Sequence, residues 1–321
     1  MSQASTTVDL SPEVEDFQAD VLAGLRSTPK ELPSKYLYDA EGSRLFEKIC
    51  ELDEYYPTRT EMGILDRHVG EMASALGPRA VVVEFGTGAG LKTEVLLDAL
   101  EDPVAFVPID ISAEALDESA NRLARRFPEL KVLPVCADYT QDWEIPEIEQ
   151  PHGRRSVFFP GSTIGNFDRG PAQDFMGRIA KFCGPGGGFL VGVDLKKDPA
   201  VLERAYDDRE GVTAAFNLNL LTRMNRELGA DFDLQGFRHR AAWNDLDGRV
   251  EMHLDSLRDQ TVRFEGGDTV SFAQGESICT EHCNKFELDE FRKISERAGF
   301  RVENVWLDEK RYFSLQWLVA V

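Results

Sequence analysis

The sequence predicts an α/β protein whose main domain is a parallel β-sheet covered by helices on both faces, with a second, α+β domain beside it. Two observations predict the sheet: short apolar runs alternate with helical segments between residues 80 and 193, and a glycine-rich turn follows the first run. A third observation predicts the second domain, because residues 197–285 abandon this alternation.

Residues 10 to about 60 are expected to be helix and loop, followed by an amphipathic helix over 61–77. The alternation then predicts strand 80–85, helix 91–100, strand 104–109, helix 113–126, strand 131–135, strand 155–159, helix 170–182 and strand 188–193. The apolar run at 81–83 is uninterrupted, as in a strand buried on both faces. Helix 287–298 and two final strands, 301–308 and 312–321, should add an antiparallel strand to the same sheet.

The intervening segment has a different pattern. It predicts helices over 200–206 and 211–227, a loop over 229–237, and strands near 249–257, 260–265 and 268–272. We therefore expect one domain made of 61–196 and 286–321, and a substrate domain made of 10–60 and 197–285.

The composition is that of a soluble globular protein, with 321 residues, 42% hydrophobic and 29% charged. A formal net charge of -21 argues against nucleic-acid or anionic-membrane partners. No apolar run approaches the roughly 20 residues of a membrane helix, and the first residues lack the pattern of a signal peptide. We expect a cytoplasmic protein.

The cysteines are few and scattered: Cys50, Cys136, Cys183, Cys279 and Cys283. An odd, sparse set fits free thiols in a reducing compartment better than a disulfide framework. The stretch "CTEHCNK" does group Cys279, His282 and Cys283, which raises the alternative of a zinc site. It lacks paired C-x-x-C spacing and a fourth ligand, so we expect no metal.

The turn "EFGTGAG" has the form E-x-G-x-G-x-G, with Glu84, Gly86, Gly88 and Gly90. Glycines here let the backbone approach a nucleotide-type ligand, although a tight turn without a ligand is the plainer alternative. A dinucleotide fingerprint would need glycine or alanine where Leu91 stands, which disfavours an NAD-linked oxidoreductase. The pattern resembles the first motif of the Rossmann-like class I S-adenosylmethionine (SAM)-dependent methyltransferases, and a carboxylate at Glu84 suits a ligand that carries an ammonium and a sulfonium.

Two further strands also end in acidic residues. Asp110 follows the second strand, and Asp138 with Tyr139 follows the third. Each acid alone could be a solvated strand end, but three in register favour a cofactor site. By the same resemblance, Asp110 would bind the ribose hydroxyls, and Asp138 and Tyr139 would bind and enclose the adenine.

Longer motifs give a narrower resemblance, which runs from about residue 20 to the end. They are "LPSKYLYDAEGSRLFEKICELDEYYPTRTE", "GSTIGNF", "AYDDREGVTAAFNLN", "RVEMHL" and "TEHCNKF". Together they resemble the histidine-specific Nα-methyltransferases of ergothioneine biosynthesis. The resemblance implies that SAM is the methyl donor and that the α-amino group of L-histidine is methylated three times, giving hercynine.

The resemblance also implies roles for individual residues. The cofactor residues would be Glu84, Gly86, Gly88, Lys92, Asp110, Asp138 and Tyr139, and the substrate residues Tyr55, Asn166, Tyr206, Met252, Glu281 and Cys283. Asn166 and Tyr206 would donate to the substrate carboxylate, and Glu281 would hold the imidazole N–H in a pocket lined by Tyr55 and Met252. Tyr38 and the backbone at Gly161 would lie near the amino group.

The sequence departs from the family pattern at one position, and several residues and the function have alternative interpretations. In the family pattern a serine stands where this chain has Cys283, and a thiol is a weaker hydrogen-bond donor. Tyr55 and Met252 could be core residues and Glu281 could face solvent. A methyltransferase for tryptophan or another aromatic amino acid, and a non-catalytic SAM-binding regulator, are the rival functions. The expected partners are SAM and L-histidine, without nucleic acid or membrane, and a monomer is expected.

Overall fold

The computed structural model describes residues 8–10, 14–86, 88, 90–111, 113–141 and 143–321. Residues 1–7, which bear on the expectation about a signal peptide, lie outside these ranges, as do the loop positions Thr87 and Ala89. The chain divides into two compact units. The first unit comprises Met1–Pro12, Pro57–Lys196 and Lys285–Val321, and the second comprises Glu13–Tyr56 and Lys197–Asn284.

The first unit is built on a sheet of nine strands within the described residues. They are β1 (Val8–Leu10), β3 (Val81–Phe85), β4 (Ala105–Asp110), β5 (Lys131–Val132), β6 (Val135–Ala137), β7 (Arg155–Phe159), β8 (Gly188–Asp194), β14 (Phe300–Leu307) and β15 (Phe313–Ala320). The order is β1-β6-β4-β3-β7-β8-β15-β14, with β5 also beside β4. Pairing is parallel except around β15, which runs antiparallel to β8 and β14. The predicted fold class and the antiparallel C-terminal addition are confirmed.

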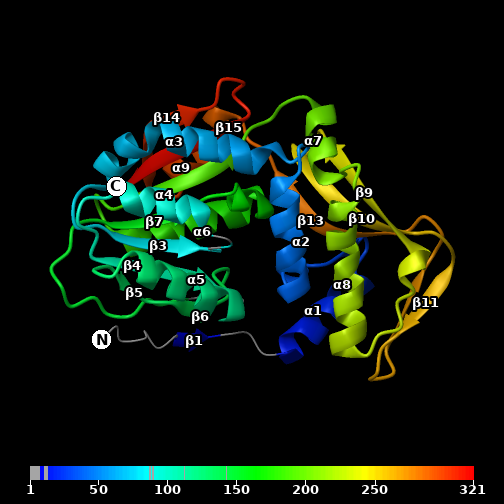
Figure 1. Ribbon diagram of the computed structural model, residues 1–321. Coiled ribbons are helices and arrows are strands. Elements are labelled where there is room, and N and C mark those ends of the chain that lie inside the picture. Colours follow the sequence, from blue (N-terminus) through cyan, green and yellow to red (C-terminus); the bar gives the residue numbers. More distant parts are fainter. Residues whose placement is uncertain (1–7, 11–13, 87, 89, 112, 142) are drawn as a thin grey trace. The chain divides into compact units, whose positions relative to one another are not determined.

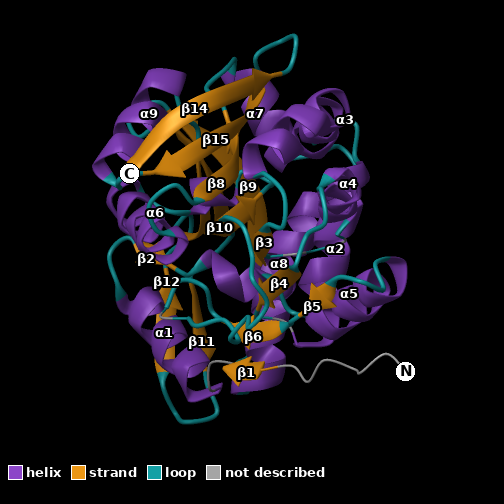
Figure 2. Ribbon diagram, turned by 90° about the vertical axis from the view of Figure 1, so that its left-hand side faces the viewer, coloured by secondary structure: helices purple, strands orange, loops and turns teal. Residues whose placement is uncertain are grey.

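Helices cover both faces of this sheet (Figures 1 and 2). They are α3 (Tyr56–Leu76), α4 (Leu91–Ala99), α5 (Ala113–Arg126), α6 (Arg169–Cys183) and α9 (Leu288–Arg297), with the short 3₁₀ helix η2 (Thr163–Asn166) after β7. Alternate residues of β3 enter two separate cores: Val81 and Val83 pack with α6 and α9, and Val82 packs with α3, α4 and α5. The predicted strand 131–135 is two strands instead, because Pro134 lacks the N–H that a continuous ladder requires.

The strand order places a topological switch at β3. From β3 the chain first builds outward through β4 and β6, and it later returns to β7 on the other side of β3. In open α/β sheets, ligands bind outside the carboxyl ends of the strands at such a switch. The glycine turn lies at this point.

The chain leaves the first unit after Lys196 and returns to it at Lys285. A buried ion pair joins the residues next to these two points. Lys285 Nζ lies 2.8 Å from Asp194 Oδ2, and both side chains are almost fully buried. A parallel bridge joins Leu195 to Phe286, whose amide donates to the Asp194 carbonyl at 3.1 Å. A buried charge without its partner is strongly destabilising. The Asp194–Lys285 pair therefore holds the two points of the chain next to each other.

The second unit combines helices with a four-stranded sheet. Its helices are α1 (Val14–Arg26), η1 (Ser34–Leu37), α2 (Ala40–Glu51), α7 (Pro199–Tyr206), α8 (Val212–Leu228) and η3 (Leu234–Gly236). Its strands are β2 (Lys30–Glu31), β9 (Phe237–Asn244), β10 (Arg249–Ser256) and β13 (Ser277–Asn284), in the order β2-β13-β10-β9, with a separate hairpin of β11 (Gln260–Arg263) and β12 (Thr269–Phe272). The sequence did not predict β9, which has no β-branched residue, or β13, in which the inward-facing Glu281 and an irregularity in register interrupt the apolar alternation.

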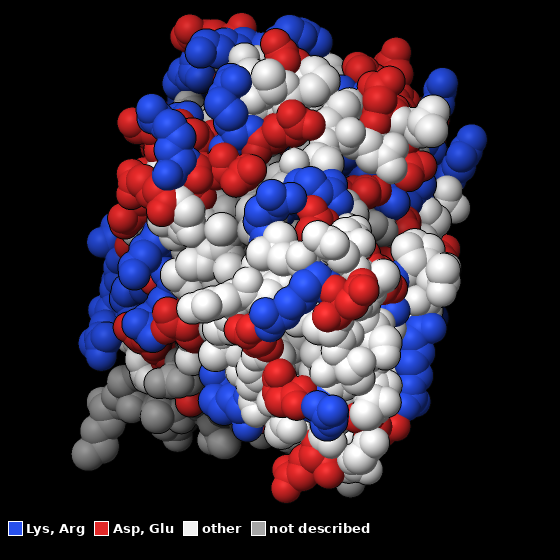
Figure 3. All heavy atoms as spheres, turned by 90° about the vertical axis from the view of Figure 1, so that its right-hand side faces the viewer, with Lys and Arg blue, Asp and Glu red and all other residues white. Residues whose placement is uncertain are grey.

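One face of the molecule shows how the charged side chains are mixed. On the face shown in Figure 3, acidic and basic side chains are interspersed. The formal net charge of the chain is -21. Within the described ranges, every helix falls short of the length and apolarity that crossing a bilayer demands.

One close contact in the sheet can be tested by mutation. A Cβ on Gly188 would lie 1.8 Å from Cη2 of Trp317, which is fully buried. We expect Gly188→Ala to cost about 1–3 kcal/mol of unfolding free energy through overpacking, and Trp317→Phe in the same chain to recover part of it. Urea denaturation measures this.

The matched control is Gly177→Ala in α6, where a Cβ would meet the Ala298 carbonyl at an ordinary 3.9 Å. That change should be neutral or stabilising by up to ~1 kcal/mol. Equal stability of Gly188→Ala and the parent chain would contradict the packing described for Trp317.

Candidate active site

The glycine turn after β3 has backbone angles that favour glycine. Gly86, Gly88 and Gly90 have φ of 67°, 46° and 69°, a region that other L-residues rarely adopt. Gly90 is the N-cap of α4, and a Cβ there would lie 2.2 Å from the Arg122 guanidinium. At Gly86 and Gly88, which are exposed, a Cβ would meet no described atom within 4 Å, so their backbone is open to a ligand.

Glu84 is a buried carboxyl at the end of β3. It is 1% exposed and accepts a hydrogen bond of 2.6 Å from Thr93 Oγ1. Burial raises the pKa of Glu84 to about 8, and the nearby carboxylates of Glu61 and Asp110 act in the same direction, against Lys92. Burial therefore favours the protonated form of Glu84 in the protein without ligand.

Asp110, Asp138 and Tyr139 come together at the ends of neighbouring strands. Asp110 is the last residue of β4, which pairs with β6, and Asp138 and Tyr139 follow β6 directly. Burial raises the pKa of the Tyr139 phenol, and the carboxylates of Asp110 and Asp138 raise it further. The Tyr139 ring packs against Phe85, with 5.5 Å between ring centroids. An aromatic ring beside two acids is a suitable surface for a nucleoside.

A further carboxylate, Glu61, connects two predicted site residues. Glu61 lies on α3, is fully buried, and forms an ion pair with Lys92 Nζ at 2.6 Å. Its two oxygens accept from the Gly161 amide at 3.0 and 2.9 Å. A Cβ on Gly192 would lie 2.3 Å from Glu61 Oε1, so the neighbouring strand must keep a glycine there. Asn166, at the end of η2, is in this unit too.

Sequence reasoning missed Glu61, although a signal was present. Glu61 precedes Ile64 and Leu65 by one helical turn, and both are fully buried. A charged residue on the apolar stripe of a helix indicates a buried polar contact.

In the second unit, five aromatic side chains form a group that we call the aromatic cluster. Its members are Tyr38, Phe46, Tyr55, Tyr206 and Phe216. Ring centroids are 5.5 Å apart for Tyr38 and Phe46, 5.4 Å for Tyr38 and Phe216, and 6.1 Å for Tyr55 and Tyr206, all edge to face. Phe46, on α2, was missed because nothing marked it among the other aromatic residues.

Glu281, Met252 and Cys283 lie on the inner face of the second unit's sheet. Met252 pairs directly with Glu281 across β10 and β13, and Val250 pairs with Cys283, so these side chains share one face. All three predicted residues are buried.

Tyr55 links this face to the aromatic cluster. Burial raises the pKa of the Tyr55 phenol well above its usual value, and Cys50, Cys283, Tyr38 and Glu281 lie close enough to raise it further. Five predicted residues of the second unit therefore meet in one place: Tyr38, Tyr55, Met252, Glu281 and Cys283. Tyr206 joins them through its ring contact with Tyr55.

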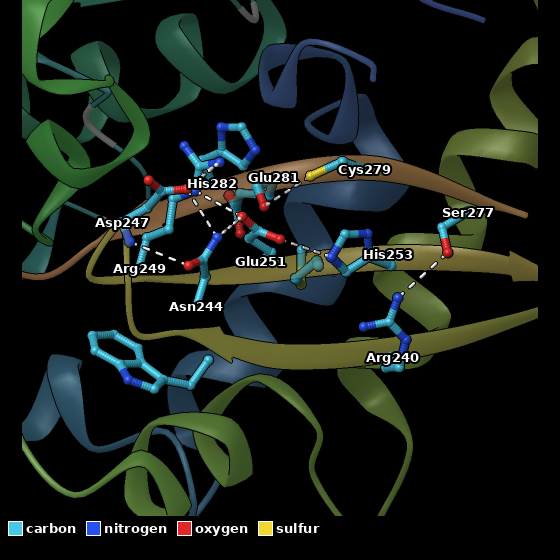
Figure 4. A network of polar contacts seen from close by, with 12 residues as sticks. Arg240, Asn244, Asp247, Arg249, Glu251, His253, Ser277, Cys279, Glu281 and His282 are labelled. Carbon is cyan, nitrogen blue, oxygen red and sulfur yellow. Dashed lines mark hydrogen bonds and ion pairs between the residues drawn. The ribbon is translucent and has the colours of Figure 1, made fainter. Parts of the chain in front are cut away.

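The opposite face of the same sheet carries a separate polar network (Figure 4). Glu251 accepts from Arg249 at 2.8 Å and lies 3.1 Å from His253, while Asn244 bonds Glu251 at 3.0 Å. His282 pairs with Glu251 in register and so lies on this outer face.

The "CTEHC" stretch is consequently divided between two faces, with His282 outside and Cys283 inside. No group of three or more potential metal ligands occurs among the residues that the structure describes. Burial raises the pKa of the Cys279 thiol to about 12, which disfavours a thiolate ligand. None of the five cysteines, all of which are described, takes part in a disulfide bond.

The raised pKa of Glu84 predicts a pH dependence of stability. Between the unfolded value of about 4.5 and the folded value of about 8, the folded chain holds a proton that the unfolded chain has lost. Stability should therefore fall as pH rises through this window and level off above it. In the protein without ligand, Glu84→Gln should reduce the loss between pH 6 and pH 9 by about 2 kcal/mol.

Urea denaturation at the two pH values measures the effect. Glu129→Gln, at an exposed position, is the control and should leave the pH dependence unchanged. The same loss in Glu84→Gln as in the parent would show that Glu84 is already ionised.

Comparison with known proteins agrees with this geometry. The chain is 42% identical over 310 residues to the histidine N-alpha-methyltransferase of Mycolicibacterium smegmatis, covering 95% of each chain. It is 44% identical over 305 residues to that of Mycobacterium tuberculosis, covering 93% of each. Ergothioneine biosynthesis protein 1 of Neurospora crassa is 29% identical over 88% of this chain and 32% of its own length.

A family model described as "Histidine-specific methyltransferase, SAM-dependent" matches residues 17–320. This is nearly the whole chain, and it includes all the residues that the structure brings together in either unit. The chain belongs to the family of SAM-dependent, histidine-specific methyltransferases.

Proposed function

We propose that the first unit carries the SAM site and that the second unit recognises L-histidine. The enzyme transfers three methyl groups to the α-amino group of L-histidine, giving hercynine for ergothioneine biosynthesis. The observation that carries the assignment of the substrate site is the buried Glu281 beside Tyr55 and Cys283. A buried carboxylate among aromatic side chains can accept a hydrogen bond from an imidazole N–H. An indole or phenyl ring would leave the desolvation of this carboxylate poorly compensated.

The residues of the first unit fit a cationic nucleoside. Asp110 would accept from both ribose hydroxyls, Asp138 from the adenine amine, and Tyr139 would cover the base. SAM supplies the methyl group from a sulfonium. A cationic ligand favours the ionised form of Glu84, so binding at neutral pH should release its proton. Lys92, held by Glu61, would lie at the edge of the same site.

The residues of the second unit would hold the substrate by its polar ends. Glu281 and Cys283 would bind the imidazole, with Met252 and Tyr55 as walls. Tyr206, together with Asn166 of the first unit, would donate to the α-carboxylate. Near the amino group, Tyr38 would pass the lost proton to water, and the backbone at Gly161 would serve as a further polar contact.

The aromatic cluster suits every stage of methylation. Positive charge passes from sulfur to nitrogen, so no new net charge develops and catalysis depends on alignment, worth up to about 7–11 kcal/mol. The trimethylammonium product cannot donate hydrogen bonds. Rings such as Phe46 and Phe216 would stabilise that cation by about 0.5–2 kcal/mol. We further propose that the protein is a cytoplasmic monomer without nucleic-acid or membrane partners, because its net charge is acidic and its cysteines form no disulfide bonds. Sedimentation of the purified enzyme would test the oligomeric state.

Asp110→Ala should weaken SAM binding by roughly 1.5–3 kcal/mol, the scale of hydrogen bonds to a charged group. Calorimetric titration with SAM measures this directly. Asp174→Ala, on an exposed turn of α6, is the control and should bind SAM like the parent. An unchanged dissociation constant in Asp110→Ala would rule out the ribose contact.

Glu281→Ala should reduce the preference for histidine over tryptophan and phenylalanine. Histidine should lose roughly ten- to a hundredfold in binding because its imidazole N–H loses a buried acceptor, whereas the aromatic amino acids never used the carboxylate. Cys283→Ser should help histidine slightly or have no effect. The measurement is the relative methylation of the three amino acids at one SAM concentration.

The control is Glu251→Ala, which removes a glutamate side chain from the outer face of the same sheet. It should leave the preference for histidine unchanged. Equal fractional losses for all three amino acids in Glu281→Ala would mean that Glu281 is structural and that the imidazole is recognised elsewhere.

A further inference from the structure

A buried chain of hydrogen bonds leads to the backbone of Tyr206. His239 lies on β9, 8% exposed, with its Nε2 2.8 Å from the Tyr206 carbonyl oxygen. Its Nδ1 lies 2.9 Å from Nδ2 of Asn217, a fully buried residue of α8. The same Asn217 nitrogen donates to the His253 carbonyl at 3.2 Å.

The two carbonyl ends of this chain fix its direction. A carbonyl can only accept, so Asn217 must turn its amide nitrogen toward His253, and His239 must carry its proton on Nε2. The Nδ1 lone pair of His239 then accepts from Asn217. Burial lowers the pKa of His239, which keeps the ring neutral. One tautomer of one histidine satisfies both contacts.

The Asn217 carbonyl oxygen indicates that this arrangement has a role. It has no hydrogen-bond partner among the described residues, although it is buried. An unsatisfied buried oxygen is a cost, and an apolar residue of similar size would avoid it. The amide nitrogen and its effect on His239 account for an asparagine at this position.

His239 acts on the end of the helix that carries Tyr206. Tyr206 is the last residue of α7, where carbonyl groups lack partners within the helix. The Glu203 carboxylate, on the same helix, also accepts from the Trp243 amide of β9 at 3.0 Å. Two residues beyond Tyr206, Asp208 accepts from the Thr213 amide at 2.7 Å and so fixes the start of α8. The backbone at Tyr206 is held on both sides.

We propose that His239, set in one tautomer by Asn217, is the positioning residue that aims the Tyr206 hydroxyl at the substrate carboxylate. This rests on the proposed role of Tyr206 in binding L-histidine. His239 itself touches no substrate. It secures the carbonyl at the C-terminus of α7, and the Tyr206 ring then packs against Tyr55 at 6.1 Å.

Two substitutions test the Nε2–H donor of His239 separately from the contact between its Nδ1 and Asn217. In His239→Gln the side-chain amide nitrogen can occupy the position of Nε2 and still donate to the Tyr206 carbonyl. In His239→Asn the shorter amide reaches the position of Nδ1 and can meet Asn217, but it does not reach Tyr206. The readout is the ratio of kcat/KM for L-histidine to kcat/KM for L-histidine amide, which lacks the carboxylate charge.

We expect His239→Asn to lower this ratio about tenfold, while His239→Gln stays within about threefold of the parent. SAM affinity should be the same in all three proteins. Asn217→Ala should lower the ratio in the same direction but by less, because Nδ1 loses its donor while the Tyr206 carbonyl alone still favours the Nε2 proton. Asn217→Ala also decides the question if His239→Asn does not fold.

A ratio that stays at the parent value in folded His239→Asn or Asn217→Ala would overturn the inference, as would an equal loss in His239→Gln and His239→Asn. The parent enzyme tests the proposed function separately. If it does not methylate histidine, the proposed function fails. If it accepts the amide as readily as histidine, the assignment of Tyr206 to the carboxylate fails before any variant is compared.

Discussion

The first unit is governed by a sheet that is buried on both of its faces. Its central strands give charged side chains no face that reaches water, so the acids of this region lie at or near the ends of the strands. Asp110 and Asp138 follow this rule at the ends of adjacent strands. Glu84 lies one residue before the end of β3 and is buried, and its pKa rises to about 8 in consequence. A cationic ligand at this edge would interact favourably with the negative charge of these acids.

The second unit depends on strand register in the same way. Glu281 faces inward because it pairs with Met252, while its neighbour His282 pairs with Glu251 and faces outward. A shift of one residue would exchange the two faces and put His282 in place of the buried carboxylate. The outer polar network in Figure 4 opposes such a shift, since its charged members would then have to enter the apolar side.

The sequence allowed prediction of the elements between residues 80 and 194 because apolar runs and helical periodicity there are strong. It also located Asp110, Asp138 and Tyr139, since their significance depends on position after a strand. The strands β9 and β13 were not predicted, because β9 has no β-branched residue and the inward-facing Glu281 breaks the apolar alternation of β13. Glu61 and His239 were missed for a different reason: each acts by joining segments far apart in the sequence, such as α3 with Gly161.

The assignment of this enzyme depends above all on its methylating the α-nitrogen of L-histidine through to the trimethylated product. The direct measurement is incubation of the purified protein with methyl-labelled SAM and a panel of natural amino acids, with the products resolved by mass spectrometry. We expect mono-, di- and trimethylated histidine, all labelled on the α-nitrogen, with little product from tryptophan or phenylalanine. Preferred methylation of another amino acid, or of the imidazole ring of histidine, would contradict it.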